Sequence, residues 1–131
     1  MILKRQAIST DDAPAAAGPY SQAIRAGDLV FTAGQLGIDP ASGELVSDDV
    51  QAQAARALAN LGAILEAAGS GLDRLVKVTV YLADIADWPA VNEVYATEVP
   101  EPFPARSAFA VRDLPKGARV EIEAVATVEA G

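Results

Sequence analysis

The spacing of the apolar residues changes in the middle of this chain, and this change limits the folds open to it. From residue 50 to residue 68 the apolar side chains follow steps of three and four, which predicts an amphipathic helix of about five turns. Ser47 is a possible N-cap, Asp48 and Asp49 stand in the first turn, and Gly69 ends the helix. The apolar positions are Val50, Ala54, Ala57, Leu58, Leu61, Ile64, Leu65 and Ala68.

A strand follows this helix, because residues 75–83 alternate in character along the chain. Its predicted faces are Val76, Val78 and Val80 on one side and Lys77, Thr79 and Tyr81 on the other. Asp87 is placed to cap a second helix over residues 88–98, where Pro89 is tolerated in the first turn. The stripe of that helix consists of Trp88, Val91, Val94 and Tyr95.

Further segments have strand character: residues 3–8, two runs that split at residues 26–28, and the two halves of residues 103–127, joined by a turn at residues 113–117. A helix between two strands suits a crossover, whereas the first and last pairs of strands suit antiparallel hairpins. The sequence therefore predicts a single α+β domain over residues 1–131, a mixed β-sheet with two helices packed on one face.

The chain is rich in apolar residues for its size. Of its 131 residues, 51% are hydrophobic and the mean hydropathy is +0.21, more than one small core needs to bury. Part of that surface is expected to meet another copy of the chain. The apolar runs are shorter than the roughly 18 residues that span a bilayer, and residues 1–10 are too polar for a signal peptide. A cytoplasmic protein without a membrane partner is expected.

Charge and missing residue types narrow the chemistry. Ten basic and eighteen acidic residues leave a net charge of −8, the wrong sign for a protein that binds nucleic acid by neutralising phosphates. The absence of cysteine and histidine excludes disulfides, cysteine nucleophiles and the Ser-His-Asp triad, and removes the usual ligands of zinc and iron. No metal and no cofactor is expected. Catalysis must come from carboxylates, arginine, lysine, hydroxyls, backbone groups or bound water.

Charged residues interrupt the two apolar strands near the end of the chain. Arg106 offers a planar cationic fork that suits a carboxylate, either of a ligand or of a neighbouring side chain in a structural ion pair. In the last strand Glu121 and Glu123 fall on the same face as Arg119, opposite the apolar side chains. Such a face suits either a polar interior or a solvated rim. The spacing decides neither this question nor whether Arg106 binds a ligand or a neighbouring side chain.

Three other positions are weaker candidates for a binding site. Tyr20 follows the constrained pair Gly18-Pro19, which can direct its ring toward a ligand or into half-buried packing. Gly34, at the end of a predicted strand, lets the main chain approach a ligand closely or simply makes a turn. Trp88 is the first-turn anchor of the second helix.

Several segments, taken in order from about Tyr20 to Ala126, resemble the RidA family, also called YjgF, of reactive-intermediate or enamine/imine deaminases. The resemblance is carried by GPYSQA, by FTAGQLGIDPASGE, by the stretch from NLGAILEAAG to FPARSAF, and by LPKGARVEIEAVA. It implies a chorismate-mutase-like α+β fold assembled as a homotrimer. In that assembly the sheets form a central β-barrel, the helices lie outside, and three equivalent clefts lie between subunits.

The same resemblance implies roles for individual residues. Arg106 matches the arginine that binds the carboxylate of a 2-imino or 2-aminoacrylate acid, and Glu121 matches the acidic residue that holds or activates water. Tyr20 and the backbone near Gly34 line the cleft, and Trp88 stands where relatives carry an aromatic residue of the wall. Glu123 matches a common glutamate without a catalytic role.

Two positions depart from the better-known members of the family. Ala33 stands where many have serine and Ala108 where many have cysteine, although backbone groups at both positions can still contact a ligand. The expected reaction is hydrolysis of a C=N bond to a 2-oxo acid and ammonia. A trimer that binds a small carboxylic acid without turnover is the main alternative, favoured by the two alanines. Ribonuclease or translation-inhibitor activity is a second alternative, opposed by the acidic charge.

Overall fold

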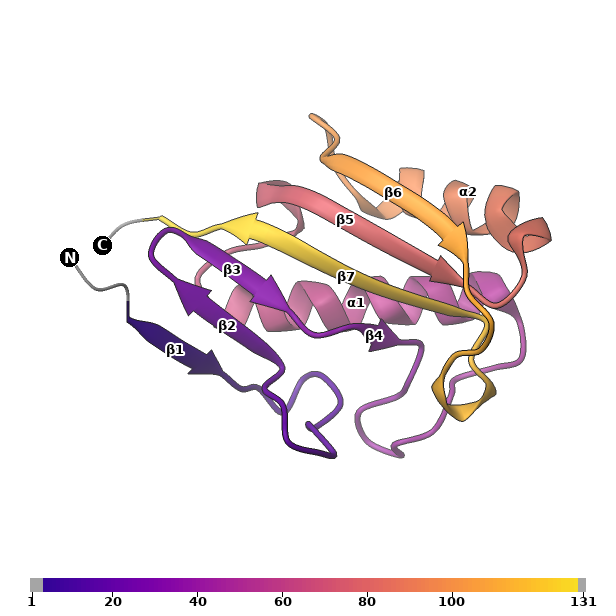
Figure 1. The fold of residues 1–131 in the computed structure, drawn as a ribbon, viewed down its shortest axis with the longest axis horizontal. Coiled ribbons are helices and arrows are strands. Elements are labelled where there is room, and N and C mark those ends of the chain that lie inside the picture. Colours follow the sequence, from indigo (N-terminus) through magenta and orange to yellow (C-terminus); the bar gives the residue numbers. More distant parts are fainter. Residues whose placement is uncertain (1–3, 130–131) are drawn as a thin grey trace.

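The computed structural model describes residues 4–129 of the chain, and Figure 1 shows both helices on the same side of one sheet. The strands are β1 (Arg5–Ile8), β2 (Ala23–Ala26), β3 (Leu29–Thr32), β4 (Gln35–Leu36), β5 (Leu75–Leu82), β6 (Ala105–Ala110) and β7 (Val120–Thr127). The helices are α1 (Val50–Ala67) and α2 (Trp88–Glu98), and short 3-10 turns cover Leu72–Arg74, Ile85–Asp87 and Pro115–Gly117. The predicted α+β architecture is confirmed.

The sheet has the strand order β1-β2-β3-β7-β5-β6, and the two-residue strand β4 pairs with β7 beyond the end of β3. Among the strands of the described residues, β5 and β6 are the one parallel pair, and α2 is the crossover that a parallel pair requires. The predicted hairpin between β2 and β3 is confirmed, with Gly27 in the left-handed region at φ 61°.

The predicted hairpin between the last two strands is wrong. Strand β5 lies between β6 and β7, parallel to β6 and antiparallel to β7. The crossover through α2 brings β6 back on the outer side of β5, and residues 111–119 then carry the chain across β5 to the β7 position. Strand β6 is therefore an edge strand whose residues are exposed, apart from the half-buried Ala108.

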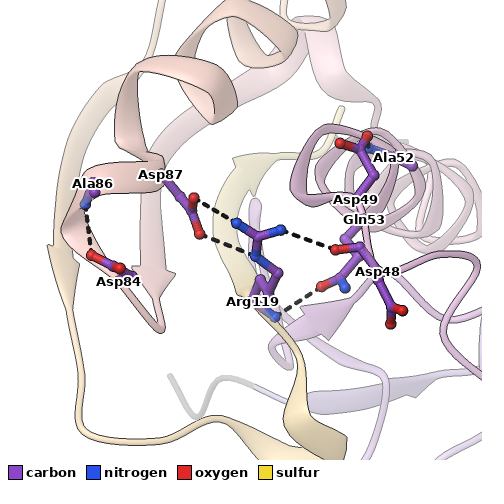
Figure 2. Close-up of polar contacts among 8 residues, drawn as sticks. All are labelled: Asp48, Asp49, Ala52, Gln53, Asp84, Ala86, Asp87 and Arg119. Carbon is purple, nitrogen blue, oxygen red and sulfur yellow. Dashed lines mark hydrogen bonds and ion pairs between the residues drawn. The ribbon is translucent and has the colours of Figure 1, made fainter.

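The helix ends also differ in detail from the prediction. Asp49, rather than Ser47, is the N-cap of α1, and its carboxylate accepts a hydrogen bond from the Ala52 amide at 2.9 Å. Asp87 occupies the N-cap position of α2, but its side chain makes no capping bond. It accepts hydrogen bonds from Arg119 at 2.7 and 3.2 Å instead (Figure 2).

Two residues predicted to lie on strand faces lie elsewhere. Val76 is 44% exposed because the pairing of β5 with β7 shifts register between Leu75 and Lys77, so it does not share the buried face of the later valines. Arg119 precedes β7 and, besides Asp87, its guanidinium bonds the Asp48 carbonyl at 3.0 Å. The buried face of β7 is otherwise as predicted, with Val120, Ile122, Ala124 and Ala126 under the helices.

Helix α1 packs closely on the chain that leaves β4. A Cβ atom at Gly37 would collide with the backbone of Gln53, so this approach requires glycine. About two turns further along the helix, the fully buried Asn60 donates hydrogen bonds to the carbonyls of Leu36 and Ile38 at 3.1 and 2.9 Å. These contacts fix residues 34–38, of which Gly34, Gln35, Leu36 and Ile38 line the larger cavity described below.

Within residues 4–129, no helix covers the second face of the sheet. It carries polar pairs, in which the Tyr81 hydroxyl donates to Glu123 at 2.9 Å and the Lys77 ammonium donates to Ser107 at 3.0 Å. It also carries exposed apolar rings, with Phe31 at 44% and Phe109 at 45% exposure. A single chain therefore leaves a mixed apolar and polar surface open on this face.

Candidate functional site

Arg106 stands on the edge strand β6, beside the parallel strand β5 and next to helix α2. Its guanidinium carbon lies 4.6 Å from the ring centroid of Trp88 and 4.8 Å from that of Tyr95. Its Nη1 donates a hydrogen bond to the Asn92 side-chain oxygen at 2.8 Å. Two aromatic faces and one neutral amide thus hold the cation in place.

None of the ion pairs found among residues 4–129 involves Arg106. The structural ion pair that the sequence left open is therefore not formed within the described chain. Because the aromatic faces accept no planar hydrogen bonds, most of the N–H groups of Arg106 remain available to an anion.

A cavity of about 360 Å³ opens beside this arginine. Its lining consists of Asn92, Tyr95, Ala96, Phe103, Pro104 and Arg106. Tyr95 is almost fully buried, and its hydroxyl has no hydrogen-bond partner among the described residues. Burial raises the pKa of that hydroxyl, while the charge of Arg106 opposes the rise.

The other predicted residues gather at a second, larger cavity of about 670 Å³. Tyr20, Ala33, Gly34 and Glu121 all line it. The remaining wall is mostly apolar and includes Pro14, Ala15, Ala17, Leu36, Ile38 and Pro40, with Lys116 at one side. The structure therefore brings together four of the predicted site residues from β7, the end of β3 and the loop before β2.

Gly34 and Glu121 are fitted to each other in this cavity. A Cβ atom at position 34 would collide with the Glu121 carboxylate, so the carboxylate lies where a side chain would otherwise stand. Burial raises the pKa of Glu121 above its ordinary value of 4.5, and repulsion from Glu123 adds to the rise. Such a carboxyl is better matched to proton transfer near neutral pH than an exposed one.

The two neighbouring glutamates differ in their partners. Glu123 accepts the hydrogen bond from Tyr81, and burial together with that bond raises the pKa of the tyrosine. Within residues 4–129, Glu121 has neither an ion pair nor a side-chain hydrogen bond. Its oxygens can therefore accept hydrogen bonds from water or a ligand in this cavity, whereas Glu123 is bonded to Tyr81 on the open face.

Tyr20 is 53% exposed at the end of the loop between β1 and β2. Its hydroxyl oxygen accepts a hydrogen bond from the Ala17 amide at 3.3 Å, so the hydroxyl proton remains available. Ala108 is half-buried, packs against the core and lines neither cavity. Trp88 contributes through its stacking on Arg106.

The two cavities share no lining residue, so Arg106 and Glu121 belong to separate surfaces of one chain. The candidate site therefore consists of two half-sites, an arginine half-site at α2 and β6 and a carboxylate half-site at β7 and the loop before β2. No three potential metal ligands of the His, Cys, Asp or Glu type lie together in the described part of the chain. Among the helices it contains, none has the length and apolar character to cross a membrane.

Neither Asn92 nor Tyr95 was assigned to a binding site from the sequence, although both contact Arg106. Asn92 and Tyr95 follow Trp88 at spacings of four and seven along α2, so all three lie on one face of the helix. The predicted stripe included Trp88 and Tyr95 but passed over the polar residue between them. The available signal was the Asn92 amide, which lies on the same helix face as Trp88 and Tyr95 and therefore could have been expected to face Arg106 with them.

The mixed sheet with two helices on one face makes the protein an α+β domain, and its relatives define the family. A family model described as Endoribonuclease L-PSP matches residues 10–128. The chain is 55% identical over 124 residues to the 2-iminobutanoate/2-iminopropanoate deaminase of Capra hircus, covering 95% of this chain and 90% of that protein. It is 49% identical over 126 residues to the chloroplastic reactive intermediate deaminase A of Arabidopsis thaliana, covering 96% and 67%.

Solved structures agree with these matches. The structure of Escherichia coli TdcF with bound serine superposes with a TM-score of 0.90 at 41% identity, covering 95% of this chain and 99% of that one. The chain belongs to the Endoribonuclease L-PSP family, and the resemblance to RidA proteins is confirmed.

Proposed function

We propose that this protein hydrolyses reactive 2-imino and enamine acids, such as 2-aminoacrylate, to 2-oxo acids and ammonia. The observation that carries the proposal is the environment of Arg106, whose guanidinium is held by two rings and an amide and keeps donors free for a carboxylate. Relatives that are 49% and 55% identical and are named deaminases support the same reaction.

In the proposed reaction Arg106 binds the substrate carboxylate and fixes the imine carbon. Glu121 accepts a proton from water as the water oxygen adds to the C=N carbon, and it passes that proton to the imine nitrogen to give a tetrahedral carbinolamine. Glu121 then accepts the proton of the carbinolamine hydroxyl as the C=O bond forms and the C–N bond breaks, and it passes this proton to the departing nitrogen, which leaves as ammonia. An enamine first takes up a proton at its terminal carbon to become the imine.

The demands on the catalyst are modest. Imines hydrolyse in water without help, so the protein need lower the barrier by only a few kcal/mol, about tenfold in rate for each 1.4 kcal/mol. One oriented carboxylate with a raised pKa and one bidentate cation are sufficient for this. The reaction needs no group that the chain lacks, since no histidine, metal or cofactor takes part.

Because Arg106 and Glu121 line different cavities, we propose that each complete site forms between neighbouring copies in a homotrimer. The exposed edge strand β6 and the exposed rings of Phe31 and Phe109 support such an assembly, since both features favour pairing with another chain. Three copies with their open faces turned inward form the barrel that the RidA resemblance implies.

The experiment couples a serine dehydratase, which releases 2-aminoacrylate, to this protein in the presence of semicarbazide as a competing trap. We expect the protein to speed pyruvate release and to reduce semicarbazone formation, and the Arg106→Lys variant to do neither. Unchanged pyruvate release with imines from several amino acids would remove the proposal.

One observation favours a second function for the same site. Serine is bound in the solved TdcF relative, so a trimer that binds a small amino or carboxylic acid without turnover is also supported. Calorimetric binding of serine by a protein inactive in the coupled assay would establish it. Cleavage of RNA is not proposed despite the description of the family, because the net charge of −8 opposes binding to phosphates.

A further inference from the structure

The loop between β1 and β2, residues 9–22, forms one wall of the carboxylate half-site without any helix or strand of its own. Pro14, Ala15, Ala17 and Tyr20 from this loop line the cavity of Glu121. A loop of this length holds one shape only if its backbone polar groups find partners in the body of the protein. The position of the wall therefore depends on whatever binds the loop.

One buried side chain supplies these bonds. Gln22 is 3% exposed, and its amide oxygen accepts a hydrogen bond from the Thr10 amide at 2.7 Å. Its amide nitrogen donates to the carbonyls of Thr10 at 3.0 Å and Pro14 at 2.8 Å, with a longer contact to Ala13 at 3.4 Å. Both donor hydrogens and the acceptor of this amide are thus used by the first half of the loop.

The backbone of Gln22 reaches the opposite side of the same cavity. Its carbonyl accepts a hydrogen bond from the Ala33 amide at 2.8 Å, beside Gly34 and the Glu121 carboxylate. The other hydrogen bonds within the loop are short-range, from the amides of Asp12, Ala17 and Tyr20 to Thr10, Tyr20 and Gly18 respectively. Gln22 is the last residue of the loop, directly before β2, and among the side chains of the described residues it alone ties the first half of the loop to this end by hydrogen bonds.

We propose that Gln22 is a positioning residue that sets which substrate side chains the enzyme accepts, an inference that rests on the proposed imine hydrolysis. With the carboxylate on Arg106 and water at Glu121, the side chain of the imino acid extends along the remaining wall. That wall has two apolar parts, Pro14, Ala15 and Ala17 on the loop and Leu36, Ile38 and Pro40 on the chain after β3. Imino acids with apolar side chains longer than methyl are the substrate class that fits it.

The discrimination follows from how firmly the loop part of this wall is held in place. A rigid apolar wall distinguishes side chains that differ by a methylene about 10-fold or more, whereas a wall that moves does so weakly. Gln22 contacts neither the substrate nor the reacting atoms, and it acts through Pro14 and its neighbours. Loss of its bonds should reduce selectivity more than it reduces the reaction of the smallest imine.

The test compares kcat/KM for the imines of leucine and alanine, made in place by an amino-acid oxidase and followed by competition with semicarbazide. In Gln22→Glu an oxygen replaces the amide nitrogen and faces the carbonyls of Thr10 and Pro14. The ionised carboxylate repels them, whereas the protonated acid can donate to one of them again. We expect the leucine-to-alanine ratio to fall about tenfold near pH 8 and to recover in part near pH 6.

Using a ratio removes the effects common to both substrates, including the titration of Glu121 and any movement of Tyr20. Gln51→Glu is the matched control, because the Gln51 side-chain amide also donates to a main-chain carbonyl, that of Ala90 at 3.0 Å, and Gln51 lines neither cavity. This amide donates to the Glu93 carboxylate at 3.1 Å as well, so Gln51→Glu, like Gln22→Glu, sets a new carboxylate against acceptor oxygens. Its ratio should equal that of the native protein at both pH values. Gln22→Met, which has similar length and no polar group, replaces Gln22→Glu if the latter fails to fold.

The outcomes separate this inference from the proposed function. Native protein that accelerates neither imine contradicts the imine hydrolysis itself. A second outcome is that the native protein accelerates both imines, while the leucine-to-alanine ratio is unchanged in Gln22→Glu and Gln22→Met although hydrogen exchange at residues 10–17 becomes faster. This outcome overturns the role proposed for Gln22 and leaves the imine hydrolysis standing. A reduced ratio that follows pH in Gln22→Glu and not in Gln51→Glu supports it.

Discussion

Two arginines flank the start of helix α2, and their surroundings differ in kind. Arg119 donates two hydrogen bonds to the carboxylate of Asp87 and a third to the Asp48 carbonyl, so its fork is occupied (Figure 2). Its own amide also donates to the side chain of Gln53 at 2.8 Å. Arg106 lies against Trp88, the residue after Asp87, and its partners are two aromatic faces and the neutral Asn92.

This difference shows how a structural arginine can be distinguished from one available to a ligand. A carboxylate partner uses the bidentate face of the guanidinium and neutralises its charge, whereas ring faces and an amide fix the group without doing either. Asp87 and Arg119 join the start of α2 to the start of β7 and to α1, which is a role in stability. Arg106 is oriented but keeps its charge and donors for an anion.

Arg106→Lys should produce the largest change and would break the comparison if it did not. Lysine keeps the charge but loses the planar fork, so we expect kcat/KM to fall at least about 100-fold, with the free energy of unfolding and the assembly unchanged. The coupled imine assay and chemical denaturation measure the two quantities. The matched control is Arg119→Lys, for which activity should stay within about threefold while stability falls. Equal loss of activity in both variants would contradict the assignment of Arg106 to ligand binding and of Arg119 to stability.

Glu121→Gln should produce the next largest change, in turnover rather than in binding. Without a group that accepts a proton from water, we expect kcat to fall about 10- to 100-fold, with little change in the affinity for a 2-oxo acid such as 2-oxobutanoate. Stopped-flow turnover and calorimetry give the two values. Normal turnover in this variant would remove Glu121 from the reaction.

The same variant has a pH signature in stability. Burial and Glu123 raise the pKa of Glu121 above its ordinary value of 4.5, so the ionised carboxylate costs folding free energy at pH values above that raised pKa. The cost disappears as the pH falls toward 4.5, because the folded chain then holds more protons than the unfolded one. Glu121→Gln should therefore be more stable than the native protein near pH 8 and no more stable near pH 4. Denaturation curves at the two pH values check this sign.

Removing the Arg119 pair should affect stability alone. Arg119→Met keeps the length of the side chain and leaves the half-buried Asp87 without its partner, so we expect the free energy of unfolding to fall by about 1 to 2 kcal/mol. The affinity for 2-oxobutanoate should remain within about twofold of the native value. Urea unfolding and calorimetry test both parts, and a loss of affinity with unchanged stability would exchange the roles assigned to the two arginines.

Asn92→Ala should have the smallest effect and would sharpen the account of how Arg106 is held. The two ring contacts remain, so we expect KM to rise about threefold to fivefold while kcat changes little. Asn92→Asp is the informative partner variant, because it gives Arg106 a carboxylate like that of Arg119 and should weaken substrate binding more than alanine does. Tighter binding in the aspartate variant would contradict the argument from free donors.

The sequence predicts this fold well where the pattern is local. The long period-three-and-four run gives α1, the alternation after it gives β5, and the turn at Gly27 gives the β2–β3 hairpin. The pairing of β7 with β5 rather than with β6 could not be read locally, since β6 and β7 follow each other in the sequence but are separated in the sheet by β5. The crossover through α2 places β6 on one side of β5 and leaves the other side of β5 free for β7. Which side each strand takes is decided by the packing of the helices on the sheet.

The candidate site divides in the same way. Family motifs pointed to Arg106, Glu121, Tyr20 and Gly34, and the structure brings all except Arg106 together at one cavity. The roles of Asn92 and Gln22 depend on contacts between elements, so residue type alone does not reveal them. Arg119 shows the converse limit, because alternation placed it beside Glu121 although its fork is bound to Asp87.

The most direct test of the account mixes two inactive variants, Arg106→Lys and Glu121→Gln, by joint refolding or co-expression with two affinity tags. If a neighbouring copy supplies Arg106 to each Glu121 half-site, a random trimer from equal amounts regains about one quarter of the native sites, and activity should return to about that level. If both groups of a working site come from the same chain, every chain in the mixture carries a defect. The mixture would then stay as inactive as its components, and the shared site would be contradicted.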